Sequence, residues 1–61
     1  MNITMMLQAH RLETAAGNYR SRAFAYLDLC NDEMVRHYLT QAAICERRAD
    51  KIRREASEAS R

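Results

Sequence analysis

Small and apolar residues recur along the chain at alternating spacings of three and four, in two runs separated by a short polar stretch. This alternation is typical of a helix that packs along one line against another helix. Two such runs predict two long helices, and we call the line of these positions the seam. The first run consists of Met5, Ala9, Leu12, Ala16, Tyr19, Ala23, Tyr26 and Cys30, and the second of Val35, Tyr38, Ala42, Cys45, Ala49, Ile52, Ala56 and Ala59.

The stretch between the two runs contains signals for a helix start. Asn31 is a favourable N-cap, because its side-chain oxygen can accept a hydrogen bond from a free N–H of the next turn. Asp32 and Glu33 follow, where the helix dipole favours negative charge. We therefore predict helix one at about residues 3–29, a turn at about 30–32 and helix two at about 32–58. Asn2 or Thr4 could cap helix one.

Gly17-Asn18 is the one sequence that argues against a continuous first helix. Glycine costs about 1 kcal/mol relative to alanine inside a helix, and it commonly ends one. The seam nevertheless keeps its spacing through Ala16 and Tyr19. We therefore predict that helix one continues through Gly17.

An antiparallel hairpin brings the two seams together in register. Beside the seam, this arrangement places Arg20 opposite Glu46 and Glu13 opposite Arg53, and such opposite charges favour one register. The predicted fold class is therefore all-α, a single domain over residues 1–61 in which two antiparallel helices share an alanine-rich heptad seam. The predicted seam pairs are Ala23 with Ala42, Ala16 with Ala49, Ala9 with Ala56, Tyr26 with Tyr38, Tyr19 with Cys45, and Leu12 with Ile52.

The length of the chain, 61 residues, limits how much surface it can bury. A domain of this size buries only about 60% of its unfolded surface and is marginal as a monomer. It needs a disulfide, a metal, a partner or very regular packing. With no proline and only one glycine, the composition favours regular helices and a partner.

The two cysteines are too few for the disulfide framework of a small secreted protein. Residues 1–9 lack the basic start and long apolar run of a signal peptide. No stretch approaches the roughly 20 apolar residues that span a bilayer. We therefore expect a soluble cytoplasmic protein, and the net charge of +2 is too small to indicate nucleic acid by itself.

The residue types that carry chemistry are few and scattered. In the hairpin Cys30 and Cys45 lie roughly 15 Å apart along the axis, too far for a disulfide. Both belong to the seam, where free cysteine packs as a small buried hydrophobe. His10 and His37 have no neighbours at zinc-like spacing. Since two helices offer no pocket for a nucleophile, we predict no enzyme, no metal site and no cofactor.

Two features could indicate nucleic-acid binding. The three tyrosines could stack on bases, but their seam positions favour a role in the core. Five cations in residues 46–55 could contact phosphates, although three acidic residues alternate with them and favour a solvated, mixed surface. A small nucleic-acid-binding protein is therefore the alternative hypothesis. The cations are Arg47, Arg48, Lys51, Arg53 and Arg54.

The hairpin leaves apolar side chains uncovered along one side, and exposed apolar patches commonly mark interaction sites. A second, antiparallel copy would bring the two ends of this stripe together, with Gly17 near the crossing. We therefore predict a homodimer, a four-helix bundle; the same residues could also stay exposed on a monomer or bind another protein. The apolar stripe consists of Ile3, Met6, Phe24, Leu27, Leu39 and Ala43.

Residues 38–48, with the sequence YLTQAAICERR, resemble small accessory proteins of lambdoid bacteriophages that are encoded between the exonuclease and excisionase genes. The resemblance implies a regulator of the choice between lysis and lysogeny that contacts a host or phage protein in the host cytoplasm. It implies no catalytic residues. The predicted function is a non-enzymatic interaction module that uses the apolar stripe and a charged rim of Arg47, Arg48, Lys51 and Arg54.

Overall fold

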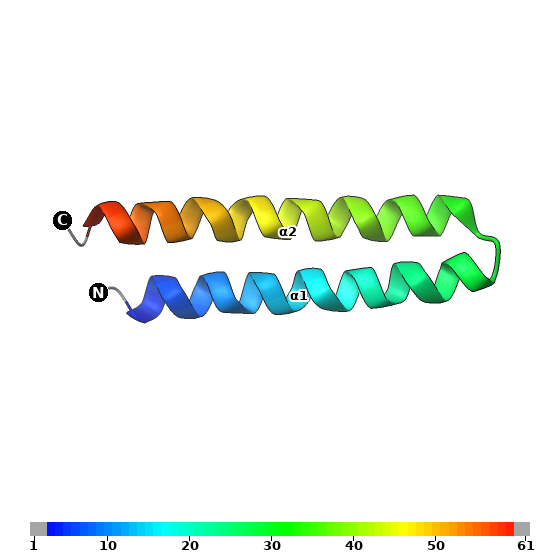
Figure 1. The fold of residues 1–61 in the computed structure, drawn as a ribbon, viewed down its shortest axis with the longest axis horizontal. Helices are drawn as coiled ribbons and strands as arrows, with labels where there is room; N and C mark the ends of the chain where they lie inside the picture. The colour runs from blue at the N-terminus through cyan, green and yellow to red at the C-terminus, as the bar shows by residue number, and fades with distance from the viewer. Residues whose placement is uncertain (1–2, 60–61) are drawn as a thin grey trace.

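The computed structural model describes residues 3–59 as two helices that lie side by side in opposite directions (Figure 1). Helix α1 spans Ile3–Asp28 and helix α2 spans Asp32–Ala59. The start of α1 and the end of α2 lie at the same end of the hairpin. The predicted all-α antiparallel hairpin is confirmed, and each helix end lies within one residue of its predicted position.

Helix α1 continues through Gly17, as the unbroken seam predicted. Gly17 does not have a positive φ. A Cβ atom added at Gly17 would meet no atom within 4 Å apart from its chain neighbours and the adjoining backbone of α1. Neither the backbone conformation nor the packing within the hairpin therefore requires glycine at this position.

Helix α1 ends in a Schellman motif. The N–H of Asn31 donates to the carbonyl of Tyr26 at 3.1 Å, and the N–H of Cys30 donates to the carbonyl of Leu27 at 3.0 Å. Between them, Cys30 adopts the left-handed conformation with φ of 55°. The prediction that Cys30 is a buried seam residue is wrong, because α1 ends at Asp28 and Cys30, which is exposed, no longer follows the helical period.

Asn31 caps the start of α2, as predicted. Its side-chain Oδ1 accepts a hydrogen bond from the N–H of Met34 at 3.3 Å, and its carbonyl accepts the N–H of Val35 at 3.1 Å. At the other end of the hairpin, Thr4 lies inside α1 and is not its cap. The alternative cap, Asn2, lies outside the described residues.

Six alanines alone form the buried core of residues 3–59, and each of these six is at most 5% exposed. The larger seam residues between them, such as Leu12 and Ile52, are half-buried, and the last seam position, Ala59, is exposed at the end of α2. Methyl groups let two helices approach closely, so longer side chains lie beside the contact rather than inside it. The six buried alanines are Ala9, Ala16, Ala23, Ala42, Ala49 and Ala56.

The hairpin is a thin rod, 48 × 13 × 9 Å across its Cα atoms. Its radius of gyration is 14.2 Å, against about 10.5 Å for a compact chain of this length. Its accessible surface is 4868 Å², against about 4,100 Å² for a typical folded monomer of this mass. The hairpin thus exposes about 800 Å² more surface than a compact domain would.

Enlarging a buried alanine should destabilise the hairpin. We expect Ala16→Leu or Ala49→Leu to lower the free energy of unfolding by about 1–3 kcal/mol, because the longer side chain would force the helices apart. Urea denaturation followed by circular dichroism measures this change. Ala25→Leu is the matched control, because Ala25 is exposed and belongs to neither the seam nor the apolar stripe; equal losses at all three sites would contradict the alanine seam.

Replacing Cys30 by glycine should stabilise the hairpin. A residue other than glycine costs about 1–2 kcal/mol in the left-handed conformation, and Cys30 occupies that conformation at φ 55°. We therefore expect Cys30→Gly to raise the free energy of unfolding by about 1 kcal/mol. Cys30→Ala, which removes the thiol but keeps the Cβ, should leave it almost unchanged; a gain in both variants would point to the thiol instead.

Candidate functional site

The hairpin has two long edges, one on each side of the line of buried alanines. Consecutive helical residues are about 100° apart, so Leu12 and Glu13 lie on opposite sides of this line. We call the side that contains Glu13 and Arg20 the ion-pair edge. We call the side that contains Leu12 and Ile52 the groove edge.

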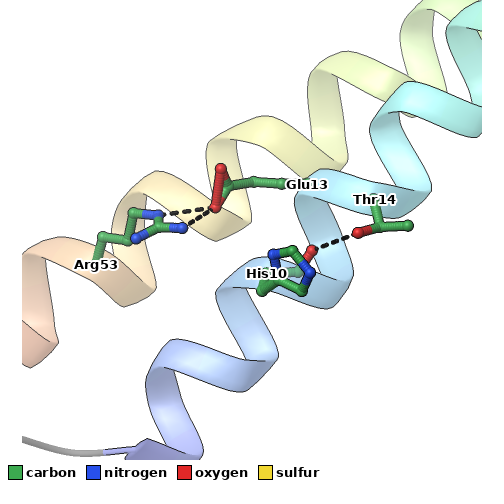
Figure 2. A network of polar contacts seen from close by, with 4 residues as sticks. All are labelled: His10, Glu13, Thr14 and Arg53. Carbon is green, nitrogen blue, oxygen red and sulfur yellow. Dashed lines mark hydrogen bonds and ion pairs between the residues drawn. The ribbon is translucent and has the colours of Figure 1, made fainter.

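Among residues 3–59, two ion pairs join the helices on the ion-pair edge, and both were predicted. Arg20 pairs with Glu46, and Arg53 pairs with Glu13. Figure 2 shows Glu13 and Arg53 reaching toward each other from α1 and α2, with the Nε of Arg53 donating to Oε1 of Glu13 at 2.8 Å. These side chains are 41–48% exposed, so each pair contributes less than about 1 kcal/mol. Their main effect is to favour the observed register.

Two hydroxyl groups of α1 donate hydrogen bonds to backbone carbonyls one turn earlier in the same helix. The hydroxyl of Thr14 donates to the carbonyl of His10 at 3.0 Å (Figure 2), and the hydroxyl of Ser21 donates to the carbonyl of Gly17 at 3.1 Å.

Within residues 3–59, no three His, Cys, Asp or Glu side chains are grouped to hold a metal ion. Neither helix over its described length is long and apolar enough to cross a membrane.

Three tyrosines stack on the groove edge near the turn. The ring of Tyr38 lies 5.6 Å from that of Tyr26 and 6.0 Å from that of Tyr19, between ring centres. The guanidinium of Arg22 lies 5.9 Å from the centre of the Tyr38 ring. The predicted Tyr26–Tyr38 pair is confirmed. The ring of Tyr19 also contacts that of Tyr38, which was not predicted. All three rings are half-buried, and their contacts with one another agree with the predicted role of the tyrosines in packing along the seam.

A shallow groove of about 490 Å³ lies on the groove edge toward the open end of the hairpin. Leu12 of α1 and Ile52 of α2, both half-buried, provide its apolar floor. The exposed side chains of Arg11, Arg48 and Lys51 line it together with one carboxylate. None of these three cations forms an ion pair within the described part of the chain. The groove therefore combines apolar surface with unneutralised positive charge.

The four residues of the predicted charged rim do not lie on one surface. Arg48 and Lys51 line the groove, whereas Arg47 and Arg54 are exposed on α2 outside it. The sequence interpretation missed Arg11, because it considered only the cations of helix two. The signal was available, since Arg11 precedes Leu12 and the predicted pair of Leu12 with Ile52 brings it to the same edge.

The apolar stripe is mostly exposed to solvent. Ile3 is 69% exposed and Phe24 is 64% exposed, and Leu27 and Leu39 are exposed as well. Met6 is half-buried, so it adds less uncovered surface than predicted. The stripe has two apolar ends: Ile3 and Met6 near the start of α1, and the other three large residues near the turn.

Comparisons with protein-family models, with curated proteins and with solved structures find no match for this chain.

Exchanging the charges of one ion pair should test its role in the register. We expect Glu13→Arg to lower the free energy of unfolding by about 1 kcal/mol, because it places two cations opposite each other. Adding Arg53→Glu should recover most of this loss. Denaturation of both single variants and of the double variant measures the coupling, which should shrink with added salt. Strictly additive effects would show that the two side chains do not interact.

Proposed function

We propose that this protein is a non-enzymatic protein-interaction module that functions as a homodimer. The observation that carries the proposal is the surface of the hairpin, 4868 Å², which exceeds that of a compact monomer by about 800 Å². A standard protein interface buries about 800 Å² on each partner. Pairing two copies would therefore reduce the accessible surface of each chain to about that of a compact monomer of the same mass.

The apolar stripe is the surface that we propose for this contact. Its apolar ends lie on either side of a polar middle that includes Glu13 and Arg20. A second hairpin in the opposite direction would place Ile3 of one copy near Phe24 of the other, so each apolar end would cover its counterpart. Two hairpins packed in this way form a four-helix bundle with isologous contacts.

Gly17 supports the same arrangement. Glycine weakens a helix, yet nothing inside the hairpin requires it there. A Cβ would meet no side chain beyond its chain neighbours and no atom of α2 within 4 Å. Gly17 lies on α1 between the two apolar ends of the stripe, where two antiparallel copies would cross. A close approach of the second copy would account for the missing side chain.

We further propose that the dimer contacts a host or phage protein and regulates the choice between lysis and lysogeny, which rests on the resemblance of residues 38–48 alone. Nucleic-acid binding has less support, because the basic residues of α2 do not form one surface. Arg53 pairs with Glu13, and Arg47 lies outside the groove that contains Arg48 and Lys51.

Sedimentation velocity at micromolar concentration tests the dimer. We expect the unmodified chain to sediment as a dimer and Phe24→Asp to sediment as a monomer, because a carboxylate in the apolar contact would lose its water. Ile44→Asp is the matched control, since Ile44 is an exposed apolar residue of α2 with no stripe residue three or four positions away. A monomeric unmodified chain, or equal disruption by both variants, would contradict the proposed interface.

Gly17→Ala should separate the stability of the helix from the stability of the dimer. In the monomeric Phe24→Asp background, we expect Gly17→Ala to raise the free energy of unfolding by about 1 kcal/mol, because alanine favours helix. In the dimer, the added methyl group at the crossing should weaken association. Sedimentation equilibrium measures this second effect; unchanged association would place Gly17 away from the contact.

A further inference from the structure

We propose that the groove binds a short acidic, amphipathic helix of another protein. Apolar side chains of that helix would rest on Leu12 and Ile52, and its carboxylates would reach Arg11, Arg48 and Lys51. This inference rests on the proposed interaction function and deepens it by giving the chemical class of the partner. It does not depend on the dimer.

The apolar floor of the groove results from the way the seam packs. The alanines bring the helices so close that larger seam residues cannot fit between them, and Leu12 and Ile52 remain half-buried. Both side chains line the groove, which is open to solvent between α1 and α2. Apolar side chains from a partner would remove this surface from water, which is favourable.

The charge of the groove selects an acidic partner. Three of the ten Lys and Arg residues line it, with one of the eight Asp and Glu residues, Glu55. The seven cations and seven anions elsewhere cancel, so the groove accounts for the whole net charge of +2. On the ion-pair edge, by contrast, Arg20 and Arg53 are already neutralised by Glu46 and Glu13. Carboxylates of a partner would give the groove cations the charge-assisted hydrogen bonds that they lack here.

The length and composition of the groove favour a helix over a nucleic acid. Along α2, its lining residues extend from Arg48 to Glu55, which is about two helical turns or roughly 10 Å. An amphipathic helix presents apolar residues at this spacing with charges on both sides. A nucleic acid would leave Leu12 and Ile52 without apolar contacts, and its phosphates would be repelled by Glu55.

The groove and the apolar stripe lie on opposite sides of the alanine line. Leu12 and Ile52 belong to the groove edge, whereas Phe24 belongs to the side that contains Arg20. One hairpin therefore holds a complete groove, and a dimer built on the stripe would present two grooves facing outward.

Fluorescence anisotropy tests the inference with a labelled peptide of about twelve residues, three helical turns, made of Glu, Leu and Ala with leucines three and four apart. We expect binding to the full chain at low salt and about tenfold weaker binding to Arg48→Glu. Arg47→Glu is the matched control, because the neighbouring arginine lies outside the groove. It should change affinity by no more than about twofold, through net charge alone. Circular dichroism verifies that both variants remain helical.

Each of the following results would overturn the inference. They are the absence of peptide binding at low salt, an equal loss in Arg47→Glu and Arg48→Glu, and tighter binding of a single-stranded oligonucleotide of the same charge. A peptide of the same composition with its leucines scrambled around the helix should bind more weakly, and equal binding would also contradict the apolar floor.

The Phe24→Asp variant separates this inference from the dimer. We expect it to bind the peptide as tightly as the unmodified chain, because it leaves the groove intact. If the unmodified chain proves monomeric yet binds the peptide, the dimer proposal fails and the groove assignment stands. Loss of peptide binding in Phe24→Asp would overturn the assignment of a complete groove to one hairpin.

Discussion

Contact between alanine methyl groups across the two helices is the interaction on which the rest of the molecule depends. The six buried alanines recur every seven residues on each helix, so every second layer of the seam is small on both sides. Small layers allow the closest approach of two helix axes. They bury little apolar surface per residue, and regularity rather than volume holds the hairpin together.

The close approach also explains why large apolar side chains remain exposed or half-buried. Residues that would form the interior of a wider bundle, such as Leu12, Tyr38 and Ile52, lie beside the contact and are only half-buried. Phe24 and Leu27 lie farther from the seam and are exposed. The alanine seam and the exposed edges therefore have one physical origin.

Most of the fold could be predicted from local and pairwise rules. The seam spacing predicted both helices, Asn31 predicted the start of α2, and the charges of Glu13 and Arg53 predicted the register. The conformation of Cys30 could not be predicted, because most left-handed C-terminal positions carry glycine. The hydrogen bonds from Cys30 and Asn31 to α1 stabilise that conformation only once the chain turns back.

The candidate site was less predictable than the fold. Arg48 and Lys51 were chosen from the charge of one helix, but a groove requires residues from two. Arg11 joins them only through the register of the hairpin, in which α1 and α2 run in opposite directions. Cations that are close in the sequence therefore need not lie on the same surface of the hairpin. The predicted seam pairs show which cations of the two helices lie on the same edge.

The seven-residue repeat of the alanines also makes the length of this hairpin modular. Inserting one heptad into each helix at facing positions would lengthen the rod by about 10 Å, add one small layer and one larger layer, and leave the turn and the open end unchanged. An insertion into only one helix would shift its downstream residues past their partners. The architecture thus allows the distance between the turn and the groove to be set in steps of two helical turns, provided that both helices change together.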